Sequence, residues 1–255
     1  FAVIQGYGLT ETAPIVSLNH PFGTKRGSVG KAIAGVDVKI AADGEVRVLV
    51  VAGAGPAFCA GLDLRELAAQ REAGAVETQT LERALETLER CPQPSVAAVQ
   101  GDAVAGGCEL ALHCDLRVAA DTARFAMPLA RIGIAVPVAL TWKLVDTIGA
   151  AATKELLFTG EPIGAEAALA LGMVNRVVPA ADLERVTGEL ARQISRQAPL
   201  SVRSMKAFVQ RLSDERRTLR RDDLEEMFRQ VRESADAREG LVAQRERRPP
   251  VFRGR

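Results

Sequence analysis

The chain has 255 residues, of which 47% are hydrophobic and 25% charged, the usual balance of a globular protein. Its formal charge of +1 excludes a general electrostatic attraction to nucleic acid or to an anionic membrane. Aromatic residues are only 4%, which argues against a base-stacking surface. The charge and the low aromatic content together predict no nucleic-acid partner. Because no apolar run reaches the length of a membrane span, we also expect no membrane insertion.

Strand and helix patterns alternate over the middle of the chain. A β-branched run predicts a strand at residues 46–51, and Leu81, Leu85 and Leu88 then recur at helical spacing. A short helix is predicted to start near Gly106. This order implies a parallel sheet with crossover helices. Further strands are predicted at residues 96–99, 116–119 and 124–126.

The chain beyond residue 137 reads as mostly helical. Leu140, Leu144 and Ile148 share one helix face, and Leu169 lies in a short Ala-rich helix. A brief strand is predicted at residues 173–178. Long amphipathic helices are predicted at residues 183–197, 202–212 and 217–235.

The cysteines indicate reduced thiols rather than a disulfide framework. Cys59, Cys91, Cys108 and Cys114 form no CxxC pair, and with only two histidines in the chain we expect no structural zinc site. Together with the absence of a visible signal peptide, this predicts a cytoplasmic protein. His113 beside Cys114 suggests a nucleophile and its base, but helix neighbours point about 100° apart, so packing is favoured for both.

Two glycine-rich turns follow predicted strands and carry the most distinctive chemistry. One contains Gly61, and the other contains Gly106 and Gly107. In an open parallel sheet such turns gather at the carboxyl ends of the strands, where ligands bind. Because glycine has no side chain, backbone N–H groups can point toward an oxygen atom of a bound ligand. The start of a helix adds the positive end of its dipole at the same place. Two converging N–H groups would form an oxyanion hole.

Glu109 lies one helical turn beyond Gly106, on the same face of the predicted helix. A carboxyl group there could act as a general base or acid beside the bound oxyanion. Alternatively, it merely complements the helix dipole. Spacing alone leaves both interpretations open.

From residue 46 to residue 255 the chain resembles the crotonase (enoyl-CoA hydratase/isomerase) superfamily. The resemblance is carried, in the family's order and spacing, by VRVLVVAGAGPAFCAGLDL, VQGDAVAGGCELALHCDLRVAAD, LLFTGEPIGAEAALALGMVNRVV and EGLVAQRERRPPVF. It implies an α/β fold, with a β-spiral of repeated ββα units at residues 46–180. It also implies a helical region at residues 181–255 that builds a homotrimer, or a dimer of trimers.

The same resemblance implies an acyl-CoA substrate and no metal, nicotinamide or flavin. The thioester oxygen would accept hydrogen bonds from the N–H groups of Leu62 and Gly106. Ala60 matches the position whose carbonyl meets the adenine. Arg65 and Arg247 match basic positions near the CoA phosphates.

Glu109 matches the first of the two catalytic glutamates of the hydratases, whereas Leu129 stands where the second is expected. Because one glutamate can act as base and then as acid, hydration of a 2-enoyl-CoA, a lyase reaction, is the leading hypothesis. Isomerisation, hydrolysis, decarboxylation, carbon–carbon cleavage and noncatalytic acyl-CoA binding are the alternatives. Met127, Leu129 and Trp142 are expected to shape the acyl pocket, and Asp102 is favoured as a solvated turn residue over a second acid.

Residues 1–45 resemble a fragment of the AMP-forming acyl-CoA synthetases. The segments QGYGLTETAPIVSLNHP and RGSVGKAIAGVDVKIAADGE carry this likeness, and residues 7–11 match the loop that contacts the adenylate. The synthetase phosphate loop, hinge and catalytic lysine are absent, so we expect no adenylation. We predict that this segment stands in for the first strands and helix of the spiral, with its boundary at Asp43-Gly44.

Overall fold

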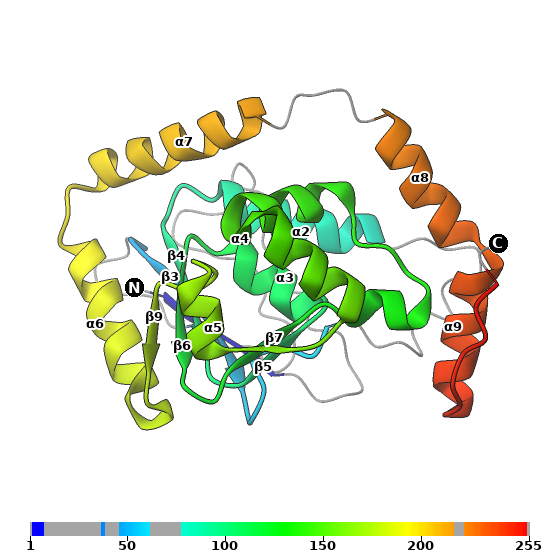
Figure 1. Ribbon diagram of the computed structural model, residues 1–255. Coiled ribbons are helices and arrows are strands. Elements are labelled where there is room, and N and C mark those ends of the chain that lie inside the picture. The colour runs from blue at the N-terminus through cyan, green and yellow to red at the C-terminus, as the bar shows by residue number, and fades with distance from the viewer. Residues whose placement is uncertain (1, 8–36, 39–45, 62–77, 217–221, 254–255) are drawn as a thin grey trace.

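The computed structural model describes residues 2–7, 37–38, 46–61, 78–216 and 222–253 (Figure 1). Its strands form a larger, mostly parallel sheet and a smaller one. The larger sheet contains β1 (Ala2–Tyr7), β2 (Asp37–Val38), β3 (Leu49–Ala54), β4 (Ser95–Val99), β6 (Leu116–Ala120) and β9 (Arg176–Val178), in the order β2-β1-β3-β4-β6-β9. The smaller sheet contains β5 (Asp102–Val104), β7 (Arg124–Ala126) and β8 (Ile163–Gly164), in the order β5-β7-β8.

Successive strands alternate between the two sheets and are followed by a helix. β4 enters the larger sheet, β5 the smaller one, and α3 (Gly106–His113) follows. β6 and β7 repeat this path one position further along both sheets, with β6 parallel to β4 and β7 parallel to β5. A 3₁₀ helix, η1 (Pro128–Ile132), and α4 (Val138–Thr159) complete the second unit. These are the repeated ββα units of a spiral.

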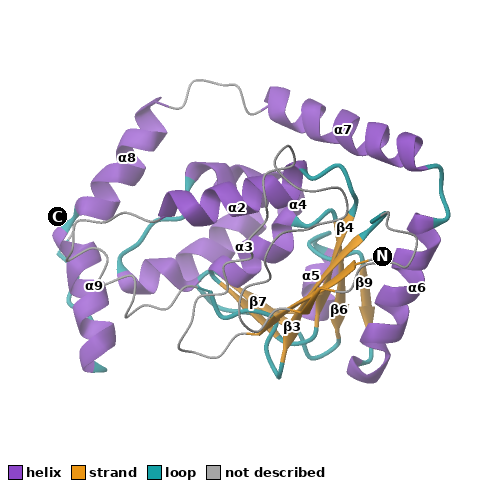
Figure 2. Cartoon of the chain, turned by 180° about the vertical axis from the view of Figure 1, so that it is seen from behind, coloured by secondary structure: helices purple, strands orange, loops and turns teal. Residues whose placement is uncertain are grey.

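The larger sheet is buried on both faces, as parallel sheets usually are. Leu49 and Val51 belong to a core cluster on one face, together with buried residues of α3 and α4. Val48 and Val50 point the other way and pack with α6 (Leu183–Ser195). The two views show α6 on the opposite side of the sheet from α2 (Thr78–Arg90), α3, α4 and α5 (Ala165–Ala170) (Figures 1 and 2). Side chains therefore alternate between two cores along β3.

The C-terminal helices extend beyond this core. α7 (Pro199–Arg216) and α8 (Asp222–Glu233) form an arch above α2 and α4, and α9 (Ala235–Glu246) lies at the far end beside the C-terminus (Figure 1). The Lys206 ammonium ties α7 to the core, because it donates to the Asp115 carboxylate at 2.7 Å and to the Gln93 carbonyl at 3.1 Å. A short 3₁₀ helix, η2 (Ala180–Asp182), precedes α6.

The structure changes several predicted boundaries. β3 begins three residues later than the strand predicted at residues 46–51, and it ends three residues later, at Ala54. The helix predicted over residues 217–235 was also wrong at its end, because Ser234 starts a new helix: its hydroxyl accepts a hydrogen bond from the Ala237 N–H at 3.0 Å.

Residues 1–45 contribute two described strands to the larger sheet. β1 pairs in parallel with β3, from Ala2 opposite Leu49 to Tyr7 opposite Ala54, and β2 pairs antiparallel with β1. These strands therefore extend the sheet beyond β3. The predicted boundary at Asp43-Gly44 lies outside the described residues.

Candidate functional site

The two glycine-rich turns lie side by side because the backbone of one pairs with β5. The N–H groups of Phe58 and Cys59 donate to the Asp102 carbonyl at 3.0 and 3.1 Å, and the Val104 N–H donates to the Cys59 carbonyl at 2.9 Å. Cys59 also forms a parallel bridge with Ala103. The segment that leads to Gly61 is thereby fixed against the strand that leads to Gly106.

Gly61 comes close to the first N–H of α3. Its φ of +90° favours glycine, and a Cβ there would lie 2.9 Å from the Val104 carbonyl oxygen and 3.1 Å from the Gly106 nitrogen. The N–H groups in the first turn of a helix have no partner within the helix. Glycine at position 61 therefore keeps open the space beside a backbone donor at the positive end of a helix.

The start of α3 has an unusual backbone. Ala105, the residue before the helix, has φ of 50° and ψ of −116°, a conformation that costs a non-glycine residue of the order of 1–3 kcal/mol. Its N–H donates to the Ala126 carbonyl at 2.9 Å, and its carbonyl accepts from the Glu109 N–H at 3.0 Å. A Cβ on Gly107 would lie 1.9 Å from the Cys59 carbonyl oxygen. These contacts hold Gly106 in one orientation.

Glu109 is half-buried in the first turn of α3. Burial, and to a smaller extent the negative charge of Glu82, raises the pKa of its carboxyl group, the positive charge of Lys143 partly opposes both, and the net pKa is about 7. A carboxylate that only complements a helix dipole would instead have a lowered pKa. At neutral pH the Glu109 carboxyl can therefore both accept and donate a proton, which favours the acid/base interpretation.

The other predicted site residues occupy varied positions. Ala60 is exposed immediately after the bridge at Cys59, and Arg247 is exposed where α9 ends in a left-handed turn (φ 55°). Leu62 and Arg65 lie outside the described residues. The structure therefore places only Gly106 of the two predicted oxyanion-hole donors.

The predicted acyl-pocket residues differ in burial. Met127 is only 1% exposed and packs in the main core. Leu129, in η1, and Trp142, in α4, are half-buried, and Leu129 packs against the same core.

Asp102 is a strand residue rather than the expected turn residue, although its side chain is solvated as expected, at 39% exposure. It begins β5, and its carboxylate accepts two hydrogen bonds from the Arg124 guanidinium, each 2.8 Å long. This pairing occupies the carboxylate of Asp102 and gives no support to its use as a second acid.

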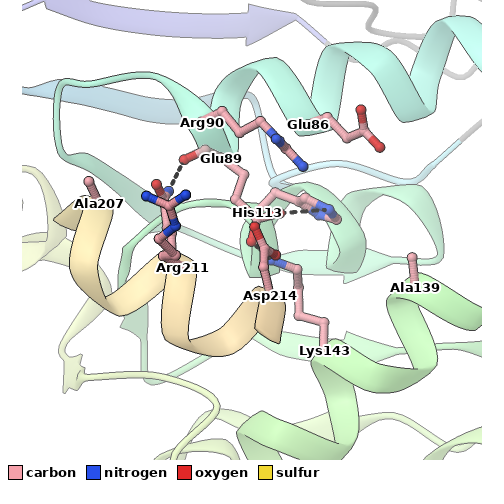
Figure 3. Close-up of a pocket in the computed structure, with 10 residues that line it drawn as sticks. Glu86, Glu89, Arg90, His113, Ala139, Lys143, Ala207, Arg211 and Asp214 are labelled. Carbon is pink, nitrogen blue, oxygen red and sulfur yellow. Dashed lines mark hydrogen bonds and ion pairs between the residues drawn. The ribbon is translucent and has the colours of Figure 1, made fainter. Parts of the chain in front are cut away.

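A cavity of about 490 Å³ lies between α2, α3, α4 and α7 (Figure 3). His113, at the end of α3, contacts the Glu109 carbonyl through Nδ1 at 2.8 Å, and its Nε2 lies 3.7 Å from the Glu89 carboxylate. The Lys143 ammonium donates to the same carboxylate at 2.7 Å. His113 therefore makes polar contacts in addition to the packing role expected for it. Cys114 is buried, as expected.

Sequence reasoning missed Glu89 and Lys143. They stand 54 positions apart on α2 and α4, and no local motif links them. Among the residues that the structure describes, no group of three or more His, Cys, Asp or Glu side chains is arranged to hold a metal ion. None of the described helices combines the length and the apolar character needed to cross a membrane.

Comparisons with known proteins agree with this geometry. The chain is 37% identical over 212 residues to the enoyl-CoA isomerase/hydratase fer4 of Mycosarcoma maydis, covering 82% of this chain and 77% of that protein. It is 36% identical over 225 residues to the carnitinyl-CoA dehydratase of Escherichia coli K12, covering 84% of each. A crystal structure of methylmalonyl-CoA decarboxylase superposes with a TM-score of 0.74 at 31% identity, over 82% of each chain.

The family profile described as enoyl-CoA hydratase/isomerase matches residues 36–255. This match confirms the resemblance to the crotonase superfamily and extends ten residues upstream of its predicted start. Residues 1–35 lie outside it. With the spiral of ββα units and the similarity to crotonase-fold structures, it shows that the chain belongs to the enoyl-CoA hydratase/isomerase family.

Proposed function

We propose that the protein adds water to the double bond of a 2-enoyl-CoA and forms a 3-hydroxyacyl-CoA. The observation that carries this proposal is the Glu109 carboxyl, with its pKa of about 7, one turn from the N–H that opens α3 at Gly106. Names of relatives support the substrate class, since they include an enoyl-CoA isomerase/hydratase and a carnitinyl-CoA dehydratase.

In the proposed reaction the thioester oxygen accepts hydrogen bonds from the N–H groups of Gly106 and Leu62. Glu109, as the carboxylate, takes a proton from water while the water oxygen bonds to C3 of the enoyl group. The C2–C3 π electrons move toward the thioester and form an enolate, which the two N–H groups stabilise. The protonated Glu109 then donates its proton to C2, so that one carboxyl group serves as base and then as acid.

The remaining proposed substrate contacts come from the family resemblance. The Ala60 carbonyl would meet the adenine, while Arg65 and Arg247 would lie near the CoA phosphates. The exposure of Ala60 and Arg247 is compatible with these roles. Met127, Leu129 and Trp142 stay the proposed residues of the acyl pocket.

The test is the loss of enoyl-thioester absorbance when the purified protein is mixed with crotonyl-CoA. We expect turnover that falls by at least about 10²-fold in Glu109→Gln, as for the loss of a general acid/base. Glu166→Gln is the matched control, because Glu166 is also a first-turn glutamate but is exposed on α5. Unchanged activity in Glu109→Gln would refute this mechanism.

Decarboxylation is a second candidate, and Leu129 favours it. An apolar side chain where hydratases carry a second glutamate holds water less well, and loss of CO₂ needs no added water. The similarity to methylmalonyl-CoA decarboxylase supports this alternative. Release of CO₂ from methylmalonyl-CoA, without loss of crotonyl-CoA, would select it. Binding of both thioesters without turnover of either would indicate a noncatalytic acyl-CoA-binding protein.

We also propose assembly into a homotrimer or a dimer of trimers through the C-terminal helices. Met205, Phe208, Val209 and Leu212 follow one another at helical spacing on α7, and each side chain is more than half exposed. An apolar stripe of this kind is typical of an interface. Light scattering should give a trimer or hexamer, and Phe208→Glu should shift the mass toward the monomer.

Two further proposals concern residues 1–45 and the compartment. We propose that residues 1–45 resemble a fragment of the AMP-forming acyl-CoA synthetases without their catalytic segments, and we therefore expect no release of pyrophosphate from ATP when a fatty acid is supplied. The free cysteines, of which Cys59, Cys108 and Cys114 are buried, support a reducing compartment such as the cytoplasm.

A further inference from the structure

Three helices are joined by polar contacts behind Glu109. Lys143 on α4 binds the carboxylate of Glu89 on α2, and the other oxygen of that carboxylate lies 3.7 Å from Nε2 of His113 on α3. His113 in turn contacts the backbone carbonyl of Glu109 at 2.8 Å. A carbonyl oxygen can only accept, so Nδ1 of His113 carries the proton that is shared with it. The contacts thus link α4 to the backbone of Glu109 by way of α2 and α3, and the step from Glu89 to His113 is an ion pair when the imidazole is protonated.

These contacts are largely shielded from bulk water. The Lys143 and His113 side chains are each 10% exposed, and that of Glu89 is 24% exposed. A charge–charge contact at such a position is screened less than one on the surface. Figure 3 shows the three side chains directed toward one space from three helices.

The charged groups around Glu109 have opposite signs. α2 contributes Glu82, whose charge raises the pKa of Glu109, and α4 contributes Lys143, whose charge lowers it. Glu89 partly neutralises Lys143 and so limits its effect on Glu109. The other charged side chains that line the cavity are Glu86 and Arg90 on α2, and Arg211 and Asp214 on α7.

We propose that Lys143, Glu89 and His113 form a positioning cluster that holds the last turn of α3 and sets the charge around the Glu109 carboxyl. The inference rests on the proposed acid/base role of Glu109. It assigns to these residues no contact with the substrate. Their effect on the reaction passes through Glu109 alone.

The two charged members of the cluster should act on Glu109 in opposite directions. Lys143→Met removes the cation and should raise the pKa of Glu109 by about one unit, the lower end of the effect of a nearby charge. Activity at pH 7 should then fall about fivefold through kcat and recover to within about twofold at pH 9. Glu89→Gln removes the carboxylate that Lys143 binds at 2.7 Å, so the Lys143 charge should act more strongly on Glu109 and lower its pKa.

The experiment follows the Glu109 carboxyl by ¹³C NMR titration of glutamate-labelled protein, with the signal assigned by its absence in Glu109→Gln. A pH–rate profile with crotonyl-CoA accompanies it. Lys143→Arg keeps the cation and should stay close to the wild type. Lys154→Met removes an exposed lysine from the same helix and is the matched control. The double variant of Lys143→Met and Glu89→Gln should return toward the wild-type titration.

Opposite shifts in the two single variants support the cluster. An unmoved Glu109 titration in Lys143→Met, or shifts of the same sign in both variants, would overturn it, since a merely structural role predicts no such opposition. The NMR titration needs no turnover. If crotonyl-CoA is not hydrated, the proposed function fails while the charge-setting role of the cluster is still decided.

Discussion

The Glu109→Gln exchange should stabilise the folded protein at alkaline pH while it removes activity. In the folded protein the pKa of Glu109 is about 7, against an ordinary value of 4.5. At about 1.4 kcal/mol per pH unit, ionising this half-buried carboxyl costs about 3 kcal/mol of folding free energy at pH 8. Glutamine keeps the shape of the side chain but cannot ionise, so the variant avoids this cost.

The sign of the pH dependence follows from proton binding. Between pH 4.5 and pH 7 the folded protein keeps a proton on Glu109 that the unfolded chain has lost. The stability of the wild type therefore falls as the pH rises through this window. The cost is below about 1 kcal/mol at pH 5 and complete above pH 7.

Urea unfolding of both proteins at pH 5 and pH 8, at one protein concentration, measures the difference. We expect Glu109→Gln to be more stable than the wild type by about 3 kcal/mol at pH 8 and by less than about 1 kcal/mol at pH 5. Glu166→Gln, on the exposed first turn of α5, should show no such gain. A Glu109→Gln variant that is less stable than the wild type at pH 8, or an equal difference at both pH values, would refute the reasoning.

Three other predictions follow from the same site and its supports. The value of kcat/KM for crotonyl-CoA should rise with an apparent pKa of about 7, because the reaction starts from the carboxylate of Glu109; a flat profile between pH 5.5 and pH 8.5 would contradict this. Gly61→Ala should lower kcat by about 10²-fold, because its Cβ would lie 3.1 Å from the Gly106 nitrogen. Gly55→Ala has a similar φ of +88° with nothing within 4 Å, so it should keep its activity. Arg117→Met should destabilise the fold by about 3 kcal/mol in urea unfolding, since the buried guanidinium donates to three backbone carbonyls, two of them at the end of α3; an unchanged midpoint would show that water replaces it.

The candidate site was predictable from sequence where its chemistry is local. Gly106, Gly107 and Glu109 lie within one turn of helix, so the backbone donor and the carboxyl group could be placed on one face by spacing alone. The short helix starts at Gly106 as predicted, and the predicted strand at residues 124–126 has these bounds in the structure. The choice between an acid/base role and a dipole role for Glu109 could not be made from neighbouring residues in the sequence. It depends on burial and on charges from α2 and α4.

Two strands of the smaller sheet, β5 and β8, were not predicted, although β7 was. β5 lies in a segment expected to be a glycine-rich turn, and β8 has only two residues, so neither shows a strand pattern. β5 nevertheless matters to the site, because its Asp102 and Val104 backbone groups fix the turn that carries Gly61. The helix expected over residues 217–235 ends at Glu233, and a serine cap at Ser234 starts α9, which was not predicted.

The sequence by itself determined the class of fold, the family and the residues of the glycine-rich turns, because strand runs, helical spacing and motif order are properties of neighbouring residues. Only the tertiary structure decided the environment of those residues. It brought Gly61 so close to the start of α3 that a Cβ added to this glycine would lie 3.1 Å from the Gly106 nitrogen. It also placed the Lys143 ammonium 2.7 Å from the Glu89 carboxylate, although the two residues are 54 positions apart in sequence. The desolvation and Coulomb energies that shift a pKa depend on distances in space, and these arise only when the helices pack.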